Sequence, residues 1–133
     1  MVKAGDVIYK DRIVVGFVEP ITVFGRNGEK KEVLARIDSG ATKSSIDESL
    51  AEFLGLGPVV GRRTVRNAHG TVTRDLITVG IALGEHKYDE LFTLADRTHM
   101  KYPVLIGQNI LEKGFLIDPD KSYEGEDNES SNN

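Results

Sequence analysis

The sequence predicts a mainly β fold, a small closed barrel with two short helices. Runs of β-branched and apolar residues follow one another along most of the chain, and Gly, Pro or Asn residues separate them. Only two short segments place apolar residues at helical spacing. Many short strands with little helix suit a barrel that closes on itself. Hydrophobic residues make up 39% of the 133 residues, which is enough for one core.

The first part of the chain predicts a β-meander that ends at an acidic side chain. Its β-branched or alternating runs are residues 13–18, 21–24 and 32–37. Pro20 separates the first two runs, so we read them as successive strands. An Asn27-Gly28 pair precedes the third run and is a strong hairpin signal. The third strand then leads directly into Asp38.

A short helix is predicted to follow. Ser45 and Glu48 fit a capping box, in which Ser caps a free N–H and Glu reaches back from three residues later. Gly55 suits the C-terminal end of this helix. The residues predicted to share its apolar face are Ile46, Leu50, Phe53 and Leu54.

After Pro58 the pattern of short strands returns. The predicted strands are residues 62–66, 71–83, 88–95, 104–107 and 115–118, and a helical turn is predicted at 109–113. From residue 120 onward the sequence is rich in Glu, Asp, Ser and Asn and has almost no apolar residue. We therefore expect one domain over residues 1–119 and an acidic, disordered tail over 120–133.

Composition excludes several classes of protein. The net charge of -4 argues against nucleic acid or an anionic membrane as the main partner. With no Cys, the chain has no disulfide and no thiol nucleophile. Its start has no signal-peptide pattern, and no apolar run reaches the length of a membrane span. A cytoplasmic protein is the expectation.

The segment Asp38-Ser39-Gly40-Ala41 has two interpretations. As an ordinary turn, Asp and Ser bond local backbone groups and Gly supplies a positive φ. As a site, the preceding apolar strand presents a carboxylate, and the small residues Gly40 and Ala41 let backbone approach it closely. The apolar run 104–106 with Gly107 also has two interpretations, since it fits a plain core strand that ends at a bend. Together the two segments are more specific than either alone.

This combination resembles the retropepsin-like aspartic proteases, over residues 13–118. An apolar strand runs into Asp-Ser-Gly-Ala, and the later Val104-Leu105-Ile106-Gly107 precedes a short amphipathic segment. The resemblance implies that Asp38 is catalytic, that Ser39 braces two active-site loops across a dimer, and that the Gly40 backbone helps orient the carboxylates. Ala41 would contact substrate.

One departure from the retroviral pattern concerns a charged pair. Many retroviral members have an acidic residue and an Arg at the positions of Thr42 and Gln108. Loss of one partner would leave the other charge unpaired, whereas loss of both can change the stability very little. We therefore expect the same contact between Thr42 and Gln108 in uncharged form.

A closer resemblance is to prokaryotic proteins labelled ATP-dependent zinc proteases, whose fold is retropepsin-like. It rests on the segments 36–41 and 102–107. Some members occur with ATP-grasp ligases that add glutamates to protein tails. The residues themselves support neither zinc nor ATP, because the histidines lack metal-binding spacing and no phosphate-binding Gly loop is present. We expect no cofactor and no metal site.

Two further features have open interpretations. His69 and Gly70 lie where retropepsins place the flap, a hairpin that closes over substrate, but they equally fit a plain hairpin tip. Nearby arginines form a positive cluster that either recognises an acidic peptide or is simply solvated. They are Arg62, Arg63, Arg66 and Arg74.

An aspartic protease needs two carboxylates, and this chain has one Asp-Ser-Gly motif. The expected enzyme is therefore a homodimer that cleaves a peptide or protein substrate with a dyad made of two copies of Asp38. The alternative is a catalytically inactive binding or dimerisation module on the same fold. A metal hydrolase is a third reading, which would need convergent His and carboxylate ligands.

Overall fold

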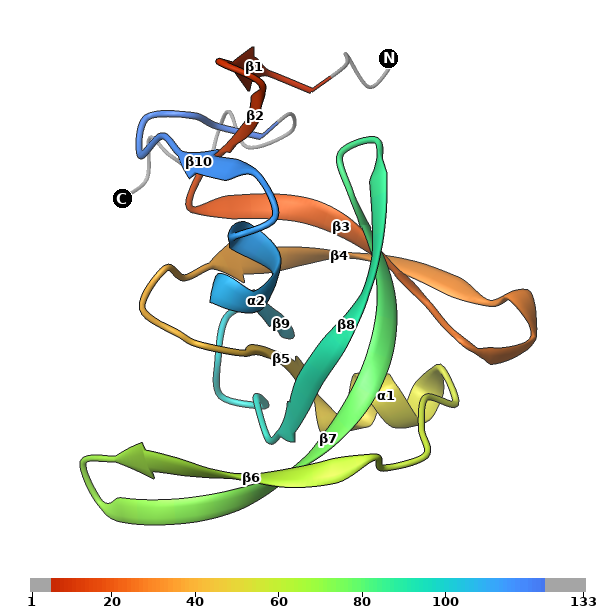
Figure 1. Cartoon of the computed structure of the whole chain (residues 1–133). Coiled ribbons are helices and arrows are strands. Elements are labelled where there is room, and N and C mark those ends of the chain that lie inside the picture. Colours follow the sequence, from red (N-terminus) through yellow and green to blue (C-terminus); the bar gives the residue numbers. More distant parts are fainter. Residues whose placement is uncertain (1–5, 124–133) are drawn as a thin grey trace.

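A computed structural model describes residues 6–123 as two β-sheets with two short helices (Figure 1). The predicted mainly β fold with two helices is confirmed. Within the described residues, neither helix is long and apolar enough to cross a membrane. The strands are β1 Ile8–Tyr9, β2 Arg12–Val15, β3 Val18–Phe24, β4 Lys30–Ile37, β5 Ser44–Asp47, β6 Gly61–Asn67, β7 Gly70–Leu83, β8 His86–Ala95, β9 Val104–Ile106 and β10 Phe115–Ile117. The α-helices are α1 Glu48–Phe53 and α2 Gln108–Leu111, with a 3₁₀ turn at Arg26–Gly28.

The larger sheet has seven strands in the order β3-β4-β9-β5-β8-β7-β6. Strand β3 also pairs with β7, so that six of these strands form a continuous ring of pairings. Among the described strands, β6 pairs only with β7, and the two extend from the ring as a hairpin (Figure 1). Side chains from several strands of the ring form one buried cluster, including Val23, Ile46, Val79 and Ile106, each 0% exposed. Burial of each such side chain stabilises the fold by about 1.5–3 kcal/mol.

The predicted meander forms, with one difference at Pro20. The β3–β4 hairpin turns at Asn27 and Gly28, whose φ angles of 63° and 82° are the left-handed conformations these residues tolerate best. Pro20 was expected to separate two strands, but it lies inside β3, and the break comes at Gly16 and Phe17. The pairing of β3 with β7 begins only at Ile21, so the missing N–H of Pro20 falls outside that ladder.

The predicted helix start at Ser45 is wrong. Ser45 lies in strand β5, where it pairs with both β8 and β9, and this tertiary pairing overrides the local capping pattern. Helix α1 begins instead after Asp47, whose side chain accepts a hydrogen bond from the Ser49 N–H at 3.1 Å. Phe53 is also misassigned, since it is 72% exposed rather than on the apolar face. Gly55 ends the helix as expected, with φ +68°.

The smaller sheet joins the two ends of the described chain. Strand β2 pairs antiparallel with β1 and parallel with β10. Next to it, the buried Glu19 carboxylate accepts from the Gly16 N–H at 2.7 Å and from Lys121 Nζ at 2.8 Å. Lys121 belongs to the segment predicted as a disordered tail, yet here it contacts the domain. The part of that predicted tail from residue 124 onward lies outside the described residues.

We predict that Lys121→Met lowers the free energy of unfolding by about 1–3 kcal/mol, because it leaves a buried carboxylate without its cation. Deletion of residues 124–133 should leave it nearly unchanged, because that segment is almost entirely polar. Urea denaturation of the full chain and both variants measures the difference. The control is Lys30→Met, which removes an exposed Lys. Equal losses for Lys121→Met and Lys30→Met would contradict the role of the Glu19 pair.

Candidate active site

Asp38 stands at the end of β4, where β9 supports it. Residues Ala35 to Ile37 pair in parallel with Val104 to Ile106, and the Asp38 N–H continues this ladder by donating to the Ile106 carbonyl at 2.9 Å. The Asp38 side chain is half-buried. Its Oδ1 accepts a hydrogen bond from the Gly40 N–H at 2.9 Å, which fixes the orientation of the carboxylate. Figure 1 shows this loop as the gold segment between β4 and β5.

Hydrogen bonds from the start of α2 fix the position of the Asp38 loop. The Gln108 N–H donates to the Ala41 carbonyl at 2.7 Å, and Gln108 Nε2 donates to the Ser39 carbonyl at 2.8 Å. Gly107 makes this approach possible, since a Cβ there would lie 2.6 Å from the Lys43 carbonyl oxygen. The structure therefore brings together Asp38 to Ala41 and the segment around Gly107, the two segments singled out from the sequence.

The expected contact between Thr42 and Gln108 takes another form. Gln108 binds the Ser39 carbonyl, while the Thr42 hydroxyl accepts a hydrogen bond from the Arg63 guanidinium. Each side chain thus binds a different partner from the one expected. The Arg63 contact joins strand β6 to the Asp38 loop.

A buried network of neutral groups lies beneath the loop, and sequence reasoning missed it. Asn109 Oδ1 accepts from the Ser44 N–H at 3.0 Å and from Ser44 Oγ at 2.8 Å. Ser44 Oγ in turn accepts from the Gly107 N–H at 3.0 Å, and Asn109 Nδ2 donates to the Leu91 carbonyl at 2.8 Å. One feature of the sequence could have indicated this network. Asn109 is a polar residue in the α2 segment, at a position that the fold buries.

The β6–β7 hairpin carries the other predicted site residues at its tip. His69 and Gly70 are exposed there, and Gly70 has φ +121°, which favours glycine. The hairpin projects on the same side of the molecule as the Asp38 loop, to the left in Figure 1. A hydrogen bond from Arg63, well before the tip, joins the hairpin to this loop.

Arg97 is a cation close enough to Asp38 for their charges to interact. Arg97, from the β8–β9 loop, is half-buried and donates through Nε to the Tyr102 carbonyl at 3.0 Å. Burial lowers the pKa of the Arg97 guanidinium, and the positive charges of Arg74 and Arg36 lower it further. The negative charges of Asp47 and Asp38 act in the opposite direction. The arginine cluster identified from the sequence did not include Arg36 or Arg97, because only the fold brings these two side chains close to each other.

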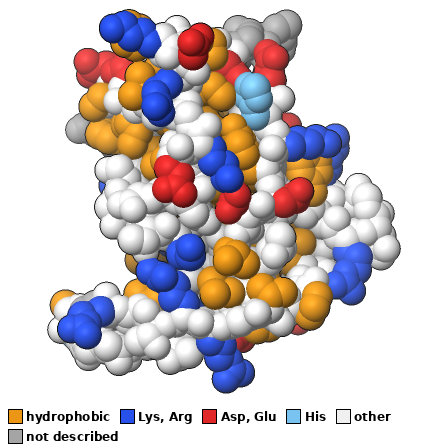
Figure 2. Space-filling model, in the orientation of Figure 1, with side chains coloured by type: hydrophobic (Ala, Val, Ile, Leu, Met, Phe, Trp, Pro, Cys, Tyr) orange, Lys and Arg blue, Asp and Glu red, His pale blue; other side chains and the backbone are white. Residues whose placement is uncertain are grey.

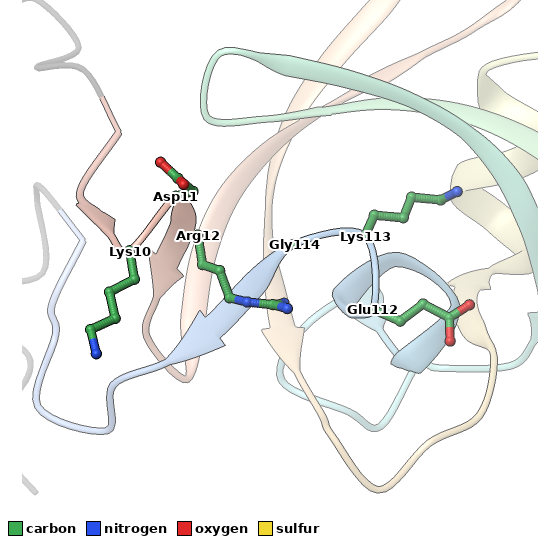
Figure 3. A pocket seen from close by; sticks show the side chains of 6 residues that line it. All are labelled: Lys10, Asp11, Arg12, Glu112, Lys113 and Gly114. Atoms are coloured by element: carbon green, nitrogen blue, oxygen red, sulfur yellow. The ribbon is translucent and has the colours of Figure 1, made fainter.

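A hollow lies between the β1–β2 turn and the turn before β10 (Figure 3). Its lining side chains point in different directions, and Lys113 Nζ forms an ion pair with the Glu90 carboxylate at 2.7 Å. It therefore lacks the converging polar groups of a binding site. Across residues 6–123, no group of three or more His, Asp or Glu side chains is placed to hold a metal ion.

We predict that Asn109→Ala lowers the free energy of unfolding by about 1–3 kcal/mol, because Ser44 then loses a buried partner. Gln108→Ala, which removes one exposed hydrogen bond, should cost less than about 1 kcal/mol. Urea unfolding curves of both variants measure the ranking. A cost for Gln108→Ala equal to that for Asn109→Ala would show that the buried network does not support the loop.

Two solved structures are similar to this fold. A Legionella pneumophila protein of unknown function superposes with a TM-score of 0.60 at 20% identity, covering 84% of this chain and 96% of its own. The simian foamy virus protease superposes with a TM-score of 0.50 at 16% identity, covering 71% of this chain and 92% of its own. At these identities the likeness shows the fold, which is retropepsin-like.

Sequence comparison finds relatives of a different name. Proteins from Parasynechococcus marenigrum and Shewanella halifaxensis, both named probable alpha-L-glutamate ligase, are 37% and 32% identical over 117 and 116 residues. The matches cover 69% and 68% of this chain but only 25% of each relative, so the chain spans about a quarter of their length. Residues 56–127 match the model of a family described as RimB-like, retropepsin-like aspartic endopeptidase RimB. The chain therefore belongs to the RimB-like family of retropepsin-like proteins.

Proposed function

We propose that this chain is an aspartic peptidase subunit that hydrolyses peptide bonds with a water activated between two Asp38 carboxylates of a homodimer. One observation carries the proposal. The Asp38 carboxylate is held half-exposed at a strand end, with its Oδ1 oriented by the Gly40 N–H and its loop fixed by Gly107 and Gln108. A reactive group held by rigid strands in this way is suited to catalysis.

The chemistry requires a second carboxylate. Two carboxylates close together share one proton, because like charges at that distance cannot both ionise. The ionised member acts as general base on water, while the protonated member donates to the scissile carbonyl. One chain supplies one such loop, so a two-fold axis beside Asp38 is the simplest way to form the pair.

The other predicted site residues have supporting roles in this proposal. Ser39 is exposed next to Asp38, where its hydroxyl is available to brace the partner loop. Ala41 offers little bulk, while its carbonyl anchors the loop to Gln108. His69 and Gly70, at the hairpin tip, would cover bound substrate as a flap. The ring of paired strands supports the further proposal that the domain is a closed barrel of the acid-protease type.

We also propose that the substrate is an acidic peptide or protein tail. Asp38, Arg36 and Arg74 all lie close enough to Arg97 to act on its charge, although the chain as a whole is acidic. A local positive field on an acidic protein favours negatively charged substrates. The names of the relatives are compatible with this, since an alpha-L-glutamate ligase would produce glutamate-containing products.

The alternative function is a catalytically inactive binding or dimerisation module. Its specific support is that both relatives are named as ligases rather than peptidases, with this chain matching only a quarter of each. In such a module the Asp38 loop would only complete an interface. The two functions differ in whether Asp38 is needed for turnover.

We predict that Asp38→Asn lowers the rate of peptide cleavage by about 10²- to 10⁴-fold, because the amide cannot act as general base. The melting temperature should stay close to that of the wild type. Asp11→Asn is the matched control, since it makes the same change at the β1–β2 turn, where φ is +67° and Asn is tolerated. Rates on glutamate-containing peptides are measured for all three proteins. Undiminished cleavage by folded Asp38→Asn would refute the assignment.

We further predict that specific activity depends on self-association. Dilution below the dimer dissociation constant should reduce it, because mass action sets the dimer population. A ninefold excess of Asp38→Asn chains leaves about one wild-type chain in ten paired with another wild-type chain, so activity should fall accordingly. The same excess of Asp11→Asn chains should leave the wild-type contribution intact. A monomer by sedimentation that keeps constant specific activity on dilution would exclude the two-chain dyad.

A further inference from the structure

The register of the β6–β7 hairpin places its arginines on two faces. Residues directly opposite in an antiparallel pair share a face, so Arg63 and Arg74, which are paired, lie on one face. Arg62 is paired with Asp75 on the other face, where they form an ion pair at 3.1 Å. Because Arg63 donates to Thr42 in the Asp38 loop, the face of Arg63 and Arg74 is the one toward that loop.

The outer part of this hairpin is a ribbon of two strands with little packing beneath it. Residues 70–75 of β7 pair with β6, and the pairing of β7 with β8 begins at Leu76. None of the described residues from 61 to 75 is buried. Another hollow, of ≈ 340 Å³, lies between residues 72–75 and the end of β8, and Figure 2 shows the hairpin standing away from the rest of the molecule. Two strands without a packed face are only marginally stable, so the position of this ribbon depends on individual contacts with the rest of the domain.

Arg63 supplies one such contact, and its acceptor lies in a firmly held part of the loop after β4. The guanidinium donates through Nη2 to Thr42 Oγ1. Helix α2 binds the chain on both sides of this Thr. The Ala41 carbonyl accepts from the first N–H of α2 at 2.7 Å, and the Ser44 N–H donates to Asn109 Oδ1 at 3.0 Å. A charged donor therefore ties the ribbon to a segment that α2 already fixes in place.

The charge pattern indicates that Arg63 serves this contact rather than the stability of the hairpin itself. Like charges directly opposite each other on neighbouring strands destabilise the pairing, and Arg63 stands opposite Arg74. On the other face, Arg62 stands opposite Asp75, which stabilises the pairing. The hydrogen bond to the Thr42 hydroxyl gives Arg63 a partner outside the hairpin.

We infer that Arg63 is a positioning residue, whose hydrogen bond to Thr42 holds the β6–β7 hairpin in a fixed place beside the Asp38 loop. This inference rests on the proposed function, in which the hairpin tip covers bound substrate, and deepens it by naming the contact that sets the hairpin. Without the bond, the hairpin is displaced in a larger fraction of chains. The apparent affinity for substrate falls with the fraction of chains whose hairpin is in place. Saturating substrate returns the hairpin to its place, so KM rises while kcat changes little.

The first test measures the position of the hairpin without substrate and therefore does not depend on the proposed function. The chain has no Cys, so Thr71→Cys on the hairpin and Glu52→Cys on α1, both at exposed positions, take one spin label each. Pulsed electron spin resonance, with labelled chains diluted in unlabelled ones, gives the distribution of distances between the two labels. Arg63→Met should raise the ratio of displaced to undisplaced hairpins about three- to tenfold, which corresponds to the loss of one hydrogen bond.

Variants of the acceptor test whether this effect comes from the bond itself. Thr42→Val should raise the ratio as much as Arg63→Met does, whereas Thr42→Ser, which keeps the hydroxyl, should not raise it. The double variant Arg63→Met with Thr42→Val should match either single variant, because both substitutions remove the same bond. Additive effects of the two substitutions, or a hairpin that stays in place in Arg63→Met, would overturn the inference.

The second test is the kinetics of peptide cleavage. Arg63→Met should raise KM about three- to tenfold and leave kcat within about twofold of the wild type. The control is Arg66→Met, which removes the same charge from the opposite face of the same strand and should leave KM and the label distances nearly unchanged. An equal rise in KM for both variants would overturn the positioning role in favour of general charge attraction. Absence of cleavage by the wild type would refute the proposed function alone, since the label distances still decide whether Arg63 holds the hairpin.

Discussion

The close contact between the Asp38 loop and Gly107 is the constraint on which the candidate site depends. A Cβ at Gly107 would lie 2.6 Å from the Lys43 carbonyl oxygen and 2.7 Å from that of Ala41, distances that real side chains do not reach. Without this approach, the Gln108 N–H would not reach the Ala41 carbonyl, and Gly107 itself would not donate to Ser44. The orientation of Asp38 therefore depends on the absence of a Cβ at Gly107, which is far from Asp38 in the sequence.

The interior and the rim of the site use different chemistry. Beneath the loop, Ser44 and Asn109 are buried and neutral, and their hydrogen bonds satisfy each other without the desolvation cost of a buried ion pair. The arginines stand at the rim, where water still reaches part of each side chain. Salt therefore has little effect on the neutral hydrogen bonds that support the loop, while the proposed attraction of acidic substrates would weaken as ionic strength rises.

Short sequence patterns predicted those parts of the fold that depend on residues close together in the sequence. Asn27 and Gly28 identified the β3–β4 hairpin because Asn and Gly tolerate its left-handed turn best, and the alternating runs identified the long β7 and β8 strands. Ser45 was misassigned because its capping pattern is local, whereas its strand pairing with β8 and β9 is not. Asp38 and Gly107 were found through a family resemblance. The Ser44–Asn109 network and Arg97 were missed, because only the folded chain brings their partners together.

The charge of the inward hairpin face depends on register rather than on composition. Arg62, Arg63, Arg66 and Arg74 form one cluster in the sequence, but side chains alternate between faces along a strand. The turn before Gly70 sets the pairing that places Arg63 and Arg74 inward and leaves Arg62 paired with Asp75 outside. A slip of β6 by one residue against β7 would turn Arg62 and Arg66 toward the loop and move Arg63, which binds Thr42, to solvent. The contact between Arg63 and Thr42 therefore supports the register that keeps Arg63 and Arg74 on the face toward the Asp38 loop.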